Sequence, residues 1–219
     1  LTSGLTDENF VFEAVMPGFI NVKVTDKKLS EVAQDILKDK HLGVSQVRQK
    51  RKVFFDYGGA NVAKELHVGH LRPAIIGESI KRILKFMGHQ VVGDAHLGDW
   101  GLQMGLIIAY MEDKEPGLPY FNKDFTGEYP KEEPFTAAEL ELIYPTASKR
   151  SKEDEAFLKK AQTAVYELQN GNRGYYALWE HIINLSVPDI KRLYDKLNVF
   201  FELWKKESDA QPYIPDMIK

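Results

Sequence analysis

The sequence predicts an α/β protein built on a parallel sheet, and two observations carry that prediction. An apolar run at Val53–Tyr57, a helical run at Leu71–Met87 and a second apolar run at Gln90–Asp94 follow one another closely. This is the pattern of a βαβ unit with parallel strands and a right-handed crossover. Polar clusters at residues 56–70 and 94–103 follow the two strands. Because ligands of parallel sheets bind beyond the carboxyl ends of the strands, we expect the binding site at this edge.

Residues 1–45 are expected to form a separate unit. Phe19–Val24 alternates apolar and polar residues, as half-buried strands do. Thr25–Lys28 is expected to turn the chain into a helix that carries Leu29–Leu37 and stops near Gly43. A strand and a helix are too small to bury a core alone. We therefore expect the end of a domain whose beginning is missing, in a chain truncated from a longer protein.

The helix expected at Leu71–Met87 has recognisable ends. Pro73 suits its first turn, where no amide partner is lost, and Gly88 suits its end. Apolar residues recur along one broad face at helical spacing. They are Ile75, Ile76, Ile80, Ile83, Leu84 and Met87.

Helices dominate the expected structure after the second strand. Asp99 is placed to cap a helix through Leu102–Tyr110. Residues 113–134 are rich in proline, glycine, charge and aromatic residues, which indicates a long loop or insertion. Residues 135–170 carry alternating charges and apolar positions at helical spacing, which predicts two surface helices.

A further helix and a strand are expected towards the end of the chain. The helix covers roughly Tyr175–Leu197, and Pro188 inside it predicts a kink or a division into two shorter helices. Val199–Trp204 is apolar enough to be a strand.

Composition excludes several classes of protein. The 219 residues are 43% hydrophobic and 28% charged, as in an ordinary globular protein. The absence of cysteine excludes disulfides and thiolate zinc sites. A net charge of −3 gives no global attraction for nucleic acid, so any such contact needs a local patch. No apolar run is long enough to span a membrane and no signal peptide is evident, so we expect no membrane contact and a cytoplasmic location.

The chemistry is expected to centre on His67 and His70. Residues three apart share one face of a helix, and Gly69 between them allows a ligand close to the backbone. Imidazoles at a helix N-terminus can donate to phosphate oxygens and stabilise charge at a reacting phosphorus. The plainer interpretation is two partly buried histidines in ordinary hydrogen bonds. A metal pair would need a third ligand that is not evident nearby, so we expect no metal site.

The residues around the histidines favour a nucleotide site. Asn61 and Lys64 lie in the same loop, and Gly58-Gly59 gives its turn conformational freedom. The sequence has neither a GxxxxGK[ST] loop nor a GxGxxG loop, so it indicates neither a P-loop ATPase nor a dinucleotide enzyme. A HxGH pair without those loops points to nucleotidyl transfer.

The run from Asp56 to Tyr110 closely resembles the start of the class I aminoacyl-tRNA synthetase catalytic domain, specifically that of the arginyl-tRNA synthetase family. The motifs that carry the resemblance are NVAKELHVGHLR at Asn61–Arg72, IIG at Ile75–Gly77 and HLGDWGLQ at His96–Gln103. Residues 10–45 resemble the close of that family's tRNA-contacting N-terminal domain. Tyr194–Ser208 resembles a later segment of the family, with Glu202 in place of Asp and Lys206 in place of Gly.

The resemblance implies a fold, a reaction and partners. Residues 1–48 would be the C-terminal part of the N-terminal domain, a small α+β domain. Residues 49–219 would be the N-terminal half of a Rossmann-like catalytic domain, with a helical insertion at about 113–175. The full-length enzyme would use ATP with Mg²⁺ to activate L-arginine and transfer it to tRNA(Arg), acting as a monomer. The isolated fragment is expected to be inactive.

The resemblance also implies roles for individual residues. His67, Gly69 and His70 would hold ATP, and the two histidines would stabilise the transition state, with Lys64 near the phosphates. The arginine substrate would be held by Asp56 and Asn61, would lie against Gly59, and would pair its guanidinium with Glu207. The site's floor would be shaped by His96, Asp99, Trp100 and Gln103.

One feature departs from the family's pattern. The family's second signature, a Lys-Met-Ser-Lys-Ser-type loop, is absent, and Lys149–Lys152 is expected to mimic it by coincidence inside a helical stretch.

The alternative function is a non-catalytic nucleotide- or tRNA-binding module that kept the fold. A small adenylyl- or cytidylyltransferase, which also uses HxGH, is a lesser rival.

Overall fold

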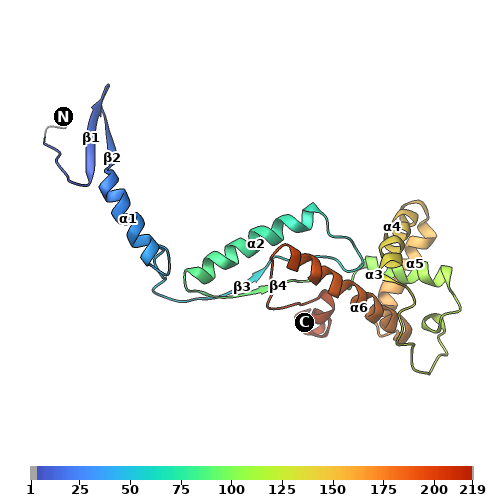
Figure 1. Ribbon diagram of the computed structural model, residues 1–219. Coiled ribbons are helices and arrows are strands. Elements are labelled where there is room, and N and C mark those ends of the chain that lie inside the picture. The colour runs from blue at the N-terminus through green and yellow to red at the C-terminus, as the bar shows by residue number, and fades with distance from the viewer. Residues whose placement is uncertain (1–3, 219) are drawn as a thin grey trace. The chain divides into compact units, whose positions relative to one another are not determined.

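The computed structural model describes residues 4–218, and Figure 1 shows their helices and strands. In chain order these elements are β1 (Phe10–Val15), β2 (Phe19–Val24), α1 (Asp26–Lys38), β3 (Lys52–Asp56), α2 (Val68–Phe86), β4 (Gln90–Asp94), α3 (Leu102–Lys114), η1 (Pro119–Phe121), α4 (Ala137–Glu153), α5 (Glu155–Gln169), α6 (Arg173–Lys196), η2 (Glu207–Tyr213) and α7 (Ile214–Met217). The chain divides into two compact units. One comprises the residues up to Arg51 with Leu84–His89, and the other comprises Lys52–Ile83 with the residues from Gln90 onward.

The first unit holds a hairpin and a helix. β2 is the strand predicted at these residues, and it pairs antiparallel with β1, which was not predicted. The expected turn at Thr25–Lys28 is wrong, because Thr25 caps α1 by accepting a hydrogen bond from the Lys28 N–H. The helix ends before Gly43, since the Asp39 carboxylate accepts the N–H groups of His41 and Gly43 and draws the chain into a turn.

α2 begins at Val68 rather than Leu71, so Pro73 lies in its second turn and the expected first-turn position is wrong. The end of the helix is as predicted. Gly88 has a φ of +99° and donates its N–H to the Lys85 carbonyl, while His89 donates to the Leu84 carbonyl. These two bonds form the Schellman motif that ends many helices at a glycine.

The predicted parallel pairing is confirmed. β3 and β4 run side by side with Lys52 opposite Gln90 and Asp56 opposite Asp94, so both strands end at the same edge. The segment predicted as a strand at Val199–Trp204 is not one. Isolated parallel bridges instead join Leu203 to Asp94 and Lys206 to Leu97.

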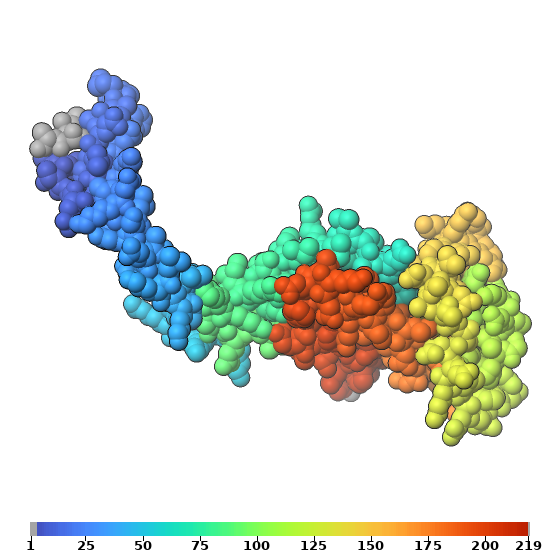
Figure 2. Space-filling model, viewed as in Figure 1, coloured from blue at the N-terminus to red at the C-terminus, as the bar shows by residue number. Residues whose placement is uncertain are grey.

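The physical reason lies at Phe200, whose backbone groups are taken by side chains. Its N–H donates to the Glu78 carboxylate, and its carbonyl accepts from the Tyr57 hydroxyl and the Lys81 ammonium. In Figure 2, the residues around position 200 lie directly against α2. A backbone used in this way cannot also supply a strand ladder.

α2 buries a face that the apolar pattern did not indicate. The described structure leaves the isoleucines exposed, with 53% of Ile76 and 57% of Ile83 accessible. The buried face carries Ala74, Gly77, Glu78 and Lys81. A Cβ at Gly77 would lie 2.3 Å from Cγ of Tyr57, so only glycine allows this approach.

The helical part forms around α3. This helix begins after Gly101, and the expected cap at Asp99 is wrong because that carboxylate instead accepts from the N–H and hydroxyl of Ser208. The two helices expected at residues 135–170 are confirmed as α4 and α5, which bury one face each around α3. The long loop expected at residues 113–134 begins with the last two residues of α3 and then contains the short η1 helix.

α6 is one helix, capped by Asn172, so of the two outcomes predicted at Pro188, a kink or a division, the division is wrong. Buried residues continue along one face on both sides of the proline, including Leu178, Ile182, Ile190 and Tyr194. Packing along that whole face offsets the single hydrogen bond that proline removes. Within residues 4–218, no helix is both long and apolar enough to cross a membrane.

Candidate active site

The loop between β3 and α2 is held against the segment that follows β4. Asn61 and Gly98 form a parallel bridge, in which Val62 donates to the Gly98 carbonyl at 3.0 Å and Gly98 donates to the Ala60 carbonyl at 3.0 Å. The two polar clusters predicted from the sequence are therefore neighbours at the carboxyl edge of the sheet. That edge is where ligands of parallel sheets bind.

His67 and His70 cap the N-terminus of α2 reciprocally. Nδ1 of His67 accepts the Gly69 N–H at 3.0 Å, and Nδ1 of His70 accepts the His67 N–H at 3.2 Å. The two ring centroids are 4.1 Å apart. Two of the amides that a helix start leaves without intrahelical partners are thus satisfied by imidazoles, in the manner of a capping box.

These bonds fix the tautomer of each neutral ring. A backbone N–H is only a donor, so each Nδ1 is an acceptor and each neutral ring carries its proton on Nε2. Burial, with the nearby His67 and Lys64, lowers the pKa of His70 and favours its neutral form. Each Nε2–H is then a hydrogen-bond donor at the helix N-terminus, where the macrodipole already favours anions.

Gly69 is needed for this arrangement. A Cβ at this position would lie 2.7 Å from Cε1 and 2.9 Å from Nδ1 of His67. The space over the glycine is therefore taken by the ring of His67, which the sequence alone did not indicate.

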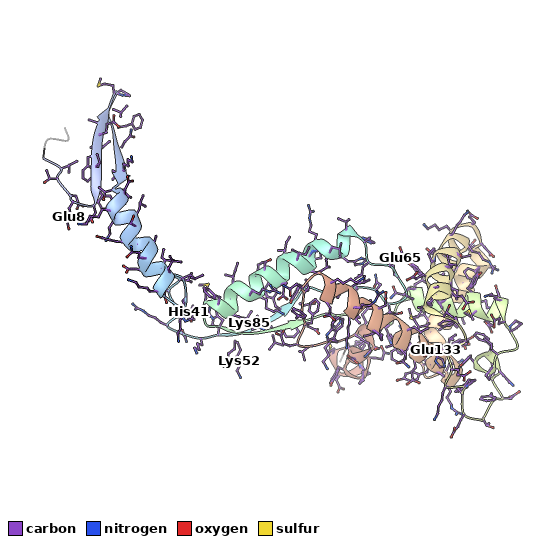
Figure 3. All side chains as sticks on the ribbon, viewed as in Figure 1. Glu8, His41, Lys52, Glu65, Lys85 and Glu133 are labelled. Carbon is purple, nitrogen blue, oxygen red and sulfur yellow. The ribbon has the colours of Figure 1, made fainter. Side chains whose placement is uncertain are left out.

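Lys64 is exposed and lies at a cavity of about 280 Å³. Its neighbour Glu65 lies in the loop before α2 (Figure 3) and lines the same cavity. The other walls come from α4 and α6, through residues such as Leu140, Ile190 and Arg192. Neither histidine of the capping pair lines this cavity.

The residues expected to bind arginine lie on three adjacent segments. Asp56 is exposed at the end of β3, and Asn61 pairs with Gly98. Gly59 is exposed, and a Cβ there would lie 3.8 Å from the His96 carbonyl oxygen. Glu207 lies on the other side of this segment, where its N–H donates to the Leu97 carbonyl.

The carboxylate of Glu207 is oriented by the chain after β4. Its Oε2 accepts the Trp100 N–H at 3.3 Å. The next residue, Ser208, is held by the buried Asp99 carboxylate, at 2.9 Å from its N–H and 2.7 Å from its hydroxyl. Burial raises the pKa of Asp99 despite these hydrogen bonds. By binding Ser208, Asp99 therefore fixes the backbone next to Glu207.

Other residues of the second cluster also make supporting contacts. Trp100 donates from Nε1 to Gln211 at 3.1 Å, and Gln103 donates to the Gly98 carbonyl at 2.6 Å. Nδ1 of His96 lies 3.5 Å from the buried Asp94 carboxylate. These contacts suit the expected role of the cluster as the floor of a site.

Comparison with known proteins identifies the family. The family described as "tRNA synthetases class I (R), catalytic domain" matches residues 31–219. The chain belongs to this family.

Relatives within the family are similar over nearly the whole chain. An arginine–tRNA ligase of Agathobacter rectalis is 57% identical over 216 residues, which are 98% of this chain and 36% of the relative. One of Alkaliphilus oremlandii is 54% identical over 95% of this chain and 36% of its own length. The chain thus spans about a third of the length of these curated relatives.

Solved structures of the family agree with the fold. The arginyl-tRNA synthetase of Plasmodium falciparum matches 97% of this chain with a TM-score of 0.65 at 25% identity, over 36% of its own length. That of Thermus thermophilus matches 94% of this chain and 31% of its own length, with a TM-score of 0.58 at 21% identity, a likeness of fold alone. The predicted α/β fold of a class I synthetase catalytic domain is confirmed.

The segment that mimics the family's second signature loop is structural. Lys149–Lys152 lies in the last turns of α4. Arg150 donates to Asp113 at 2.6 Å and to Asp154 at 3.3 Å, and its guanidinium stacks on Phe157. Its charge is already paired within the helical layer.

Sequence reasoning missed one residue that contacts the loop between β3 and α2. Ser186 on α6 accepts the Ala63 N–H, although the two are far apart in the sequence. No local pattern marks a helical serine for such a bond.

In the described part of the chain, no cluster of three His, Asp or Glu side chains is arranged to hold a metal ion.

Proposed function

We propose that the protein containing this chain is an arginine–tRNA ligase. The observation that carries the proposal is the His67–His70 pair, whose reciprocal bonds leave two Nε2–H donors at the start of α2. Membership of the class I (R) family supports the same reaction. The two curated relatives described above are named arginine–tRNA ligases.

In the proposed reaction, an oxygen of the arginine carboxylate attacks the α-phosphorus of ATP. The bond from that phosphorus to the bridging oxygen of pyrophosphate breaks, and arginyl-adenylate forms. A hydroxyl of the tRNA's terminal ribose then attacks the arginyl carbonyl, and AMP leaves. Negative charge grows on the phosphate oxygens in the first step, so fixed N–H donors there lower the barrier.

The site fits an anionic nucleotide. His67, His70 and the helix N-terminus would hold phosphate oxygens, and Gly69 allows the His67 ring its place. Lys64 is exposed in the same loop and would add a positive charge near the phosphates. Mg²⁺ would enter with the nucleotide and neutralise part of its charge.

Arginine would bind at the carboxyl edge of the sheet. Asp56 and Asn61 would hold its α-amino end, with Gly59 lining the pocket. Glu207 would pair with the guanidinium, because a carboxylate binds that planar cation through two parallel hydrogen bonds. One of its oxygens is already oriented by the Trp100 N–H.

The remaining assignments concern the whole protein. We propose that residues 1–48 close a tRNA-contacting domain and that residues 49–219 form the first half of the catalytic domain, with an insertion at about 113–175. The full-length protein would act as a monomer in the cytoplasm on ATP, L-arginine and tRNA(Arg). The chain alone would not charge tRNA.

Charging of tRNA by the full-length protein tests the role of His70. Asn can place an acceptor where Nδ1 lies, whereas Gln places a donor where Nε2–H lies. We expect His70→Asn to keep the helix cap but to lower kcat by about 100-fold, as the loss of one transition-state donor does. His70→Gln is expected to keep more activity, and the exposed Gln162→Ala on α5 serves as a control. Unchanged charging by His70→Asn would exclude the proposed role.

A further inference from the structure

A hydrogen bond joins α6 to the loop that leads to the histidine pair. The Ala63 N–H donates to Oγ of Ser186 at 3.0 Å, and both residues are buried. On one side of Ala63, Val62 is fixed by its bond to Gly98. On the other side, Lys64 and Glu65 are exposed, and His67 begins the cap of α2. Ser186 therefore holds the last buried point of the loop before the cap.

Ala63 adopts a conformation that must be held from outside. Its φ is +57°, in the left-handed region that residues with a Cβ rarely occupy. Such strained residues persist where the surrounding structure fixes them, and they gather at functional sites. The bond from Ser186 is a contact that fixes this one.

Ser186 is used differently from other hydroxyl residues on the helices. Ser79 on α2 and Thr146 on α4 donate to carbonyls one turn back in their own helices. Ser186 instead accepts across the structure from a backbone N–H. Without this oxygen, the Ala63 N–H would be buried with no acceptor, a state that folded proteins avoid.

We infer that Ser186 is a positioning residue for the nucleotide end of the site. By holding Ala63 in its left-handed conformation, it sets the path of Lys64 and the entry of the chain into the His67–His70 cap. The arginine end should be independent of it, because Asp56 and Asn61 precede Ala63 and are held by β3 and Gly98. This inference rests on the proposed function for its kinetic readout.

The test uses the full-length protein with Ser186→Ala, Ser186→Thr and the control Ser79→Ala. We expect Ser186→Ala to lower kcat for tRNA charging and to raise the KM for ATP, so that kcat/KM for ATP falls by about tenfold. The KM for arginine should change less than twofold. Ser186→Thr keeps the hydroxyl and should restore activity. Ser79→Ala should resemble the parent protein.

Hydrogen exchange of residues 62–67 provides a second readout that needs no activity. Ser186→Ala should speed exchange there and leave β4 unchanged. If Ser186→Ala does not fold, Ser186→Cys replaces it, because sulfur fills the space but accepts hydrogen bonds weakly. Unchanged exchange at residues 62–67, or equal changes in the KM for ATP and for arginine, would overturn the inference. A parent protein that does not charge tRNA with arginine would refute the proposed function, and the exchange result would still decide the role of Ser186.

Discussion

Glu78 is the centre of a buried polar network on α2. Its carboxylate lies 2.9 Å from the Lys81 ammonium and 2.7 Å from Nε of Arg82, and it accepts the Tyr57 hydroxyl at 2.7 Å. Burial alone would raise the pKa of Glu78, but the hydrogen bonds from Lys81, Arg82 and Tyr57 outweigh it and lower the pKa to about 2. The network ties α2 to the segment around Phe200.

This shift predicts how stability depends on pH. The folded pKa lies below the ordinary value of 4.5, so protons bind preferentially to the unfolded chain. The contribution of Glu78, about 3 kcal/mol, is complete above pH 5 and is lost as the pH falls towards 2. Urea unfolding between pH 7 and pH 2.5 should show this decline.

Glu78→Gln should remove the carboxylate's part of that decline. It removes the nearer of the two carboxylates beside the buried Lys81, whose ammonium also lies 3.6 Å from Glu202, so we expect a loss of about 3 kcal/mol at pH 7. The decline in unfolding free energy below pH 5 should become shallower. The exposed Glu132→Gln is the matched control and should change neither quantity. An unaltered pH profile in Glu78→Gln would contradict the account of the network.

Gly69→Ala should impair the site while sparing the fold. The added Cβ meets only the imidazole of His67, a side chain that can swing away. We expect unfolding free energy to change by less than about 1 kcal/mol, because Ala favours a helix over Gly. Charging of tRNA by the full-length protein should fall by about tenfold or more, since misplaced catalytic groups act poorly. Full activity with a displaced His67 ring would refute the role of that ring.

For individual residues, the sequence showed that His67 and His70 share a helix face, but not which hydrogen bonds they make. His67 and His70 are three residues apart, and residues at this spacing are neighbours on a helix surface. The acceptor role of each Nδ1 depends on backbone N–H groups whose positions follow from where α2 begins, and the predicted start was Leu71 rather than Val68. Ser186 could not be found from local sequence, because its partner Ala63 is near it only in the folded chain.

Among the elements, the sequence showed best those whose pattern is local. β4 and the Gly88 stop of α2 were correctly predicted, since a short apolar run and a C-terminal glycine carry their own signals. The buried face of α2 was not evident, because Glu78 and Lys81 are buried only through partners from distant segments. The residues around Phe200 were apolar enough for a strand but are bound by those same side chains.

α3 packs closely on α5 at Gly105. A Cβ at Gly105 would lie 2.1 Å from the Ala161 carbonyl oxygen, which is backbone of the facing helix and cannot move aside. Gly105→Ala must therefore push the helices apart and should cost about 2–3 kcal/mol. Gly117→Ala, with no atom within 4 Å of the added Cβ, is the control. Thermal unfolding of both variants measures the difference, and equal melting temperatures would contradict the close packing.

For the whole molecule, the parallel βαβ unit and the two polar clusters at one edge were enough to predict the fold class. The resemblance of residues 56–110 then indicated the family to which the chain belongs. The exposed isoleucines of α2 have no explanation within the described residues.

We propose that in the full-length protein the site built on His67 and His70 activates arginine for transfer to tRNA. The most direct test of this proposal is charging of tRNA by the full-length protein, with ATP, Mg²⁺ and each amino acid supplied separately. We expect arginine to be attached to tRNA and the other amino acids not to be. Attachment of a different amino acid, or none with arginine, would contradict the proposal.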